Sequence, residues 1–288
     1  MNTIKNRKVY FTISLIIIII GIGMMAFKGL NFGIEFTGGT IINIDAGEYI
    51  PEEKIKEITD SIDENMTVVY SGDNKEEIII KSASDISNKE LTSFGQNLED
   101  GYNIDSKNIS SQAVGASIGK ETRNKAIVAT LIATILMLAY ITIRFEFTLG
   151  ISAIVALVHD VLITLSIYAI FRLSVNASFI AAILTIVGYS INDTIVIFDK
   201  IRENTRFNSR QNTDEIINKS ISSSIRRTIF TTITTITAVV MLFIIGVEDI
   251  KILALPLILG MLSGTYSSIF IAPSIWYDIK TYKTRTAK

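Results

Sequence analysis

Two acidic side chains and the single histidine of this chain lie inside long apolar stretches. Asp193 sits in an apolar run over residues 186–198, and Asp160 directly follows His159 in the apolar run before it. A carboxylate in the hydrocarbon region of a bilayer costs about 2.5–3.5 kcal/mol on insertion scales, so an acid there indicates a functional site. Two acids and a histidine on neighbouring spans are suitable groups for a path that carries protons. The alternative is a structural polar cluster that holds the helices together.

The composition indicates a membrane protein with an inserted water-soluble domain. Of the 288 residues 49% are hydrophobic, and the mean hydropathy is +0.43. Residues 29–125 carry eighteen acidic and nine basic side chains, whereas the rest of the chain carries ten acidic and eighteen basic ones. The basic excess falls at the edges of apolar runs, so it does not indicate a nucleic-acid partner. The chain has no cysteine, which excludes disulfides and cysteine-ligated metals, and no cofactor is expected.

Six stretches are long enough for a membrane-crossing helix, which needs about 20 mostly apolar residues. They are residues 9–27, 126–143, 149–171, 177–198, 229–247 and 252–277. The first has a long apolar core and no small-residue cleavage site after it, so it is interpreted as an uncleaved anchor rather than a signal peptide.

The distribution of lysine and arginine predicts how these spans are oriented. Fifteen of these residues outside the acidic domain fall on one side of the six spans and three on the other. The side with more positive charge is normally cytoplasmic. We therefore expect both termini to be cytoplasmic and residues 29–125 to be extracytoplasmic. The expected domains are residues 1–28 with the first span, the outer domain 29–125, a five-helix bundle 126–277 and a tail 278–288.

The acidic domain alternates strand and helix signals. Strands are expected at residues 39–46, 67–70, 77–81 and 108–114, and helices at residues 51–65 and 87–98. The order β-α-β-β-α-β matches the ferredoxin-like α+β unit. The domain contains no histidine and no cysteine, and its residues have no catalytic spacing. It is interpreted as a binding or mechanical module, with a structural spacer as the alternative.

The predicted cytoplasmic loop 200–227 contains an amphipathic stretch. Asn212 or Thr213 can cap a helix, and isoleucines recur at positions 217, 221 and 225. This spacing predicts a helix that lies along the inner membrane surface, or else an ordinary amphipathic connector.

Arg227 leads from this loop into a span with a threonine-rich face that includes Thr231. Asp193 is six residues inside the same membrane edge, a depth of about 9 Å at 1.5 Å per residue. Arg227 can therefore either reach Asp193 or extend to the lipid headgroups. Neutral oxygens near Asp193 come from Ser190, Asn192 and Thr194, so the residues allow sodium as well as protons.

Several motifs, in order along the chain, resemble the SecF branch of the SecD/SecF family of protein-export membrane proteins. They are residues 32–40, 114–121, 156–161, 188–204 and 227–232. The first of them contains Glu35, Phe36, Thr37, Gly38 and Gly39. The sister SecD proteins resemble Asp-Leu-Arg-Gly-Gly at this place, so the Glu-Phe-Thr-Gly-Gly motif favours the SecF branch.

The resemblance implies a fold and a function. It implies a six-helix half-transporter of the RND superfamily, in the bacterial cytoplasmic membrane, without enzymatic activity. Such proteins pair with SecD beside the SecYEG channel, with YajC as an associate. They use the proton gradient, or sodium in some bacteria, to draw exported unfolded chains outward late in translocation. In that family the acid matching Asp193 and the arginine matching Arg227 are the ion-coupling pair, and the acid matching Asp160 belongs to the same polar region.

Three other functions fit parts of the sequence. An RND-type exporter of small molecules or lipids would leave the motifs above unexplained. An intramembrane aspartyl protease could use Asp160 and Asp193, but such enzymes resemble Tyr-Asp paired with Gly-x-Gly-Asp, which differs from the residues here. A purely structural membrane subunit predicts that Asp193→Asn has no effect.

Overall fold

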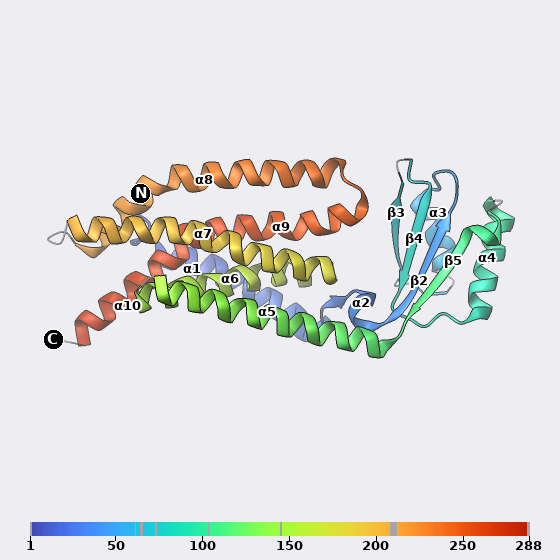
Figure 1. Cartoon of the computed structure of the whole chain (residues 1–288), viewed down its shortest axis with the longest axis horizontal. Coiled ribbons are helices and arrows are strands. Elements are labelled where there is room, and N and C mark those ends of the chain that lie inside the picture. The colour runs from blue at the N-terminus through green and yellow to red at the C-terminus, as the bar shows by residue number, and fades with distance from the viewer. Residues whose placement is uncertain are drawn as a thin grey trace.

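The structure is a computed structural model that describes residues 2–286, apart from residues 61, 64–65, 73, 103, 145 and 208–211. Figure 1 shows an elongated molecule in which a bundle of long helices is joined at one end to a smaller sheet domain. Both ends of the chain lie at the end of the bundle away from the sheet domain. We refer to that end as the terminal end of the bundle and to the other as its sheet end.

Long apolar helices make up the bundle. Within the described residues, six helical stretches are long and apolar enough to cross a membrane, which confirms the prediction from hydropathy. They are α1 (Arg7–Lys28), α5 (Ala116–Arg144), α6 (Phe147–Ile170), α7 (Ala177–Phe207), α8 (Thr213–Ile245), and α9 (Glu248–Tyr266) continued by the π-helical turn η2 (Ser267–Ile271) and α10 (Ala272–Thr286).

Of the two interpretations of the amphipathic stretch before Arg227, a separate helix along the membrane surface is wrong. α8 is one continuous helix from Thr213 to Ile245, because no proline or glycine interrupts it. Its isoleucine stripe faces protein: Ile217 and Ile221 are buried in the bundle core beside Ile201 of α7. α7 likewise runs beyond its predicted end, to Phe207. Residues 208–211, including Arg210, lie outside the described part of the chain.

The sheet domain has the predicted order of elements. In the described residues its strands are β2 (Gly39–Asp45), β3 (Thr67–Ser71), β4 (Glu77–Ser82) and β5 (Ile109–Val114). Neighbouring strands are antiparallel and their order in the sheet is β3-β4-β2-β5. The helices are α3 (Glu52–Thr59) and α4 (Asn88–Tyr102), followed by the short 3-10 turn η1 (Ser106–Asn108).

One face of this sheet packs on its helices. Ile42 of β2 and Ile80 of β4 are buried with Phe94 of α4 in a single apolar core. Alternate residues of a strand point to opposite faces, and in β2 only every second side chain is buried, on the face toward the helices. At the edge of this core the Tyr70 hydroxyl donates to the Ile50 carbonyl oxygen at 2.7 Å, and burial raises the pKa of Tyr70 to about 12.

The sheet end of the bundle is joined by short elements. β1 (Asn31–Phe32) pairs in parallel with β6 (Ser174–Val175), which links the end of α1 to the loop between α6 and α7. The one-turn helix α2 (Ile34–Thr37) follows β1 and leads into the sheet domain.

Two glycines allow α9 to lie very close to α7. A methyl group on Gly260 would overlap the side chain of Ile186, and one on Gly264 would lie 2.8 Å from the β-carbon of Ser190. Glycines four residues apart are a common device for close helix packing in membranes. The close packing brings the polar side chains of α9 and η2 to the acids of α6 and α7.

Candidate functional site

Asp160 lies at the centre of a hydrogen-bonded cluster inside the bundle. Its side chain is 1% exposed. The hydroxyls of Ser190 and Ser267 donate to Oδ2 at 2.6 and 2.8 Å, and that of Ser263 donates to Oδ1 at 2.9 Å. Nδ1 of His159 lies 3.0 Å from Oδ1. Four donors occupy the four acceptor positions of a carboxylate, so the hydrogen bonds of Asp160 are complete.

The cluster extends to the first span through His159. The other ring nitrogen, Nε2, lies 2.8 Å from the hydroxyl of Ser14 on α1. A histidine tautomer with its hydrogen on Nδ1 matches this contact, because a carboxylate oxygen accepts hydrogen bonds. The Asp160 cluster therefore joins α1, α6, α7, α9 and η2.

Asp193 has a different environment, although it is buried to the same degree, at 2% exposed. Among the described residues its only hydrogen bond is a 3.5 Å contact from the Thr232 hydroxyl to Oδ2. The same hydroxyl lies 2.9 Å from the Thr228 carbonyl oxygen, and a hydroxyl has only one hydrogen to donate. Asp193 is thus a buried carboxylate whose acceptor positions are largely unfilled.

Arg227 attracts Asp193 without forming a close ion pair with it in the described structure. Its charge acts on the Asp193 carboxylate, yet its side chain is exposed on the surface of α8. Two buried hydroxyls nearby, those of Tyr189 and Thr228, have no hydrogen-bond partner among the described residues. Tyr189 is one turn from Asp193 on α7, and Thr228 is one turn from Thr232 on α8, so both helices present a polar face here.

Further hydroxyl groups lie on the helices that carry the two acids. The hydroxyl of Ser268 lies 2.8 Å from that of Thr194 and donates to the Ser190 carbonyl oxygen at 3.2 Å. Thr232, which contacts Asp193, also lies 2.8 Å from the hydroxyl of Thr265. A polar layer therefore crosses the bundle from Ser14 to Thr232.

The structure brings together some of the residues selected from the sequence and separates others. His159, Asp160, Ser190, Asp193 and Thr194 lie in the polar layer. Asn192 and Thr231 are exposed on the outside of the bundle, where the Thr231 hydroxyl donates to the Arg227 carbonyl oxygen at 2.7 Å.

Sequence reasoning missed most of the hydroxyl groups. They are Ser14, Ser263, Thr265, Ser267 and Ser268. The available signal was the polar run 263–268 within the last apolar stretch. Single hydroxyls are common in membrane helices, and only the close packing of α9 against α7 shows what these contact.

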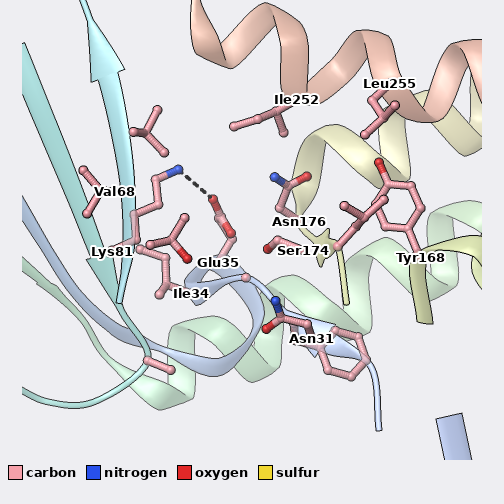
Figure 2. A pocket seen from close by; sticks show the side chains of 16 residues that line it. Asn31, Ile34, Glu35, Val68, Lys81, Tyr168, Ser174, Asn176, Ile252 and Leu255 are labelled. Atoms are coloured by element: carbon pink, nitrogen blue, oxygen red, sulfur yellow. Dashed lines mark ion pairs between the residues drawn. The ribbon is translucent and has the colours of Figure 1, made fainter. Parts of the chain in front are cut away.

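The Glu-Phe-Thr-Gly-Gly motif lies at the sheet end of the bundle, far along the chain from both acids. Figure 2 shows a pocket between the bundle and the sheet domain, with a volume of about 310 Å³, where Glu35 of α2 faces Lys81 of β4. Their charged groups are 3.8 Å apart. Ile252 and Leu255 of α9 line the same pocket as Val68 of β3. The motif thus places an ion pair across the joint between the two parts of the molecule.

The glycines of this motif are required by close backbone packing. Gly38 and Gly39 have φ angles of 81° and 144°, which side chains other than hydrogen rarely allow. A β-carbon on Gly38 would lie 2.7 Å from Ala116, and one on Gly119 would lie 2.7 Å from the Gly38 nitrogen. Phe36 is buried against the bundle, and the Thr37 hydroxyl donates to the Gly38 carbonyl oxygen at 2.8 Å.

No group of three or more histidine, cysteine or acidic side chains gathers as a metal site in the described residues. The candidate functional features are an intramembrane polar layer and a joint to a sheet domain.

Family comparisons agree with these features. A family model described as protein export membrane protein SecD/SecF, C-terminal, matches residues 94–282, and a SecD/SecF GG motif model matches residues 23–46. The chain belongs to the SecD/SecF family and is a multi-pass membrane protein.

Within this family the chain is similar to protein translocase subunit SecF from several bacteria. The protein from Sebaldella termitidis is 35% identical over 98% of this chain and 93% of its own length. The protein from Haemophilus influenzae is 33% identical over 96% of this chain and 85% of its own length. These relatives are subunits of the Sec protein translocase, which supports a role for this chain in protein translocation.

Two solved structures show the same fold. The crystal structure of SecDF, a translocon-associated membrane protein from Thermus thermophilus, is 29% identical with a TM-score of 0.83 and matches 98% of this chain. SecDF in a super-membrane-facing form is 28% identical, has a TM-score of 0.77 and matches the whole chain. This chain spans 39% and 40% of those longer chains, so the likeness associates it with a SecD half.

Proposed function

We propose that the chain couples the proton gradient to the late stage of protein export. Asp193 takes up and releases the ion, Arg227 responds to its charge, and the Asp160 cluster forms the rest of the route. Protonation removes the charge of Asp193 and its attraction to Arg227, which biases the packing of α7, α8 and α9. A local charge change that acts on an element with two packings is the physical form of such coupling.

The observation that carries this proposal is the contrast between the two buried acids. Asp160 has four hydrogen-bond donors, whereas Asp193 has one long contact and the distant attraction of Arg227. A carboxylate with unfilled acceptor positions inside a membrane is costly, so binding of a proton or a sodium ion at Asp193 is favourable. Thr194 and Ser190 supply neutral oxygens on the same helix, so sodium is the alternative coupled ion.

The proposed placement follows the charge asymmetry of the sequence. The chain resides in the bacterial cytoplasmic membrane with both termini in the cytoplasm. Residues 1–28, 126–277 and 278–288 form the anchor, bundle and tail, and residues 29–125 form the extracytoplasmic domain. The sheet order β3-β4-β2-β5 supports classing that domain as ferredoxin-like.

α9 is the element that can carry motion from the polar layer to the sheet domain. One end of it supplies Ser263 and Thr265 to the layer, and the other lies beside β3 at the joint (Figures 1 and 2). A shift of α9 against α7 therefore reaches the sheet domain directly, and the exported unfolded polypeptide is the proposed substrate of that movement.

Export into inverted membrane vesicles tests the coupling. We expect completion of translocation of a reporter preprotein to rise when a pH gradient is imposed on vesicles that contain this chain as their only SecF. The gain should vanish when the pH gradient is collapsed at constant ATP. Stimulation by a sodium gradient alone would overturn the proton assignment, and export that ignores both gradients would overturn the coupling itself.

The partner that completes the protein is the six-span SecD, acting beside SecYEG with YajC as a further associate. Arg227, Thr231 and Thr234 form an exposed polar stripe along α8. A charged group facing lipid is costly, so a second protein should cover this stripe. The greater length of the matched SecDF chains supports SecD as that protein.

Single cysteines can locate this partner because the natural chain has none. We expect Thr234→Cys on α8 to cross-link to SecD in membranes. Leu136→Cys on α5, whose side chain is 65% exposed, is the matched control and should contact lipid only. Cross-linking to SecD from position 136 but not from position 234 would place the partner against α5 instead of α8. It would contradict the proposal that SecD covers the polar stripe of α8.

A further inference from the structure

A cavity of about 270 Å³ opens between α6, α7 and α10 at the terminal end of the bundle. Its floor is formed by Leu149, Ile201 and Trp276, which belong to the apolar core of the bundle. The cavity therefore opens at the level where the apolar core ends. Tryptophan is enriched at that level of membrane proteins because one end of its ring system is apolar and the other polar.

The rim of the cavity is basic. Arg202 and Arg206 lie on successive turns of α7, and Lys280 comes from α10 with its ammonium 4.6 Å from the centre of the Trp276 ring. Neither arginine has a hydrogen bond or ion pair with any described residue, although Glu146 lines the same cavity. The rim thus carries three positive charges against one negative charge.

Topology alone does not explain this arrangement. Positive charge at the terminal end of the bundle serves to orient the spans, and that role needs only the number of bases. It does not require two arginines, each without a partner among the described residues, beside a cavity with an apolar floor. Guanidinium groups match phosphate oxygens in geometry and charge, and basic pockets between membrane helices hold anionic headgroups.

We propose that this cavity binds the phosphate of an anionic phospholipid from the leaflet at the terminal end of the bundle. Arg202 and Arg206 hold the phosphate, and the acyl chains run along the apolar outside of the bundle. A volume of about 270 Å³ lies just below the range of roughly 300–1,000 Å³ for drug-sized ligands, so it suits a headgroup rather than a whole lipid.

The chain's single tryptophan reports on this site directly, because Trp276 is part of the cavity floor. The full-length chain is placed in mixed micelles, and Trp276 fluorescence is titrated with brominated phosphatidylglycerol or brominated phosphatidylcholine. We expect phosphatidylglycerol to quench at a much lower mole fraction. Arg202→Gln and Arg206→Gln should each weaken this preference roughly fivefold, the effect of one basic group near an anionic lipid.

Three arms of the experiment make it decisive. Lys219→Gln removes one positive charge at the same end of the bundle but outside the cavity, and it should leave the preference unchanged. Quenching of Trp276 fluorescence by brominated phosphatidylcholine should be the same in every variant. This control tests whether the position of Trp276 is unchanged. Equal quenching by both lipids in the unmodified chain would overturn the proposal, as would displacement of phosphatidylglycerol by an equal concentration of inorganic phosphate.

Discussion

Cells that carry Asp193→Asn are expected to make normal amounts of the protein and to lose all gradient-dependent export. Asparagine keeps the shape of the side chain and removes its charge, so burial at this position becomes less costly. The fold should therefore be preserved, since Asp193 has a single long contact in the described structure. The measurement is secretion of a reporter protein, with and without a collapsed gradient, normalised to the level of the protein in the membrane.

Two further comparisons separate coupling from general damage. Asp249→Asn makes the same chemical change at an exposed carboxylate near the start of α9 and should be silent. Arg227→Ala should resemble Asp193→Asn, and the double variant should be little worse, because residues that act as one unit are not additive. Full gradient-dependent export by Asp193→Asn would refute the ion-coupling role, and additive defects would leave Arg227 as a headgroup anchor only.

Asp160→Ala is expected to destabilise the protein. The substitution removes the acceptor for three serine hydroxyls and for His159, all of them buried. Each unsatisfied buried donor costs about 1–3 kcal/mol, but hydroxyls in membrane helices can bond again to their own backbone. A net loss of about 3 kcal/mol follows, which lowers the melting temperature by roughly 5 °C. Thermal unfolding of the purified protein measures this loss.

The Asp160→Asn variant distinguishes support of the fold from ion coupling. A carboxamide still accepts through its oxygen, and its amino group can donate to a serine oxygen, so we expect most of the stability to return. If this variant is stable but has lost the response to the gradient, Asp160 belongs to the ion route as well. A melting temperature of Asp160→Ala equal to that of the unmodified protein would contradict the role of Asp160 in holding the helices together.

The sequence was sufficient to predict the elements, because they depend on local patterns. Runs of apolar residues predicted the six spans, and β-branched residues around Ile42 predicted a strand of the sheet domain. Their ends were less well predicted. The second span was expected to begin at residue 126, but α5 begins at Ala116, and Gly119 in its first turn packs on the backbone of Gly38.

The arrangement of the polar layer could not be predicted in the same way. Asp193 and Asp160 were conspicuous as acids in apolar runs. Nothing in the local sequence shows that Asp160 has four hydrogen-bond donors, whereas Asp193 has a single long contact. That difference depends on Gly264, which brings α9 against Ser190 and places Ser263 and Ser267 at Asp160. The surface helix and the ordinary connector both remained open in the sequence because an amphipathic stripe looks the same whether it faces lipid or protein, and here Ile217 faces protein.

The first and last strands of the sheet domain are neighbours, with Gly39 paired to Val114. The chain therefore leaves the bundle and returns to it at almost the same point. The whole domain is an insertion at a single junction of the bundle. The entropic cost of closing an inserted segment grows only slowly with its length, by about 0.6 kcal/mol for each doubling. Domains of different size and specificity could thus have been exchanged at this junction during evolution, while the helical bundle beneath kept its geometry.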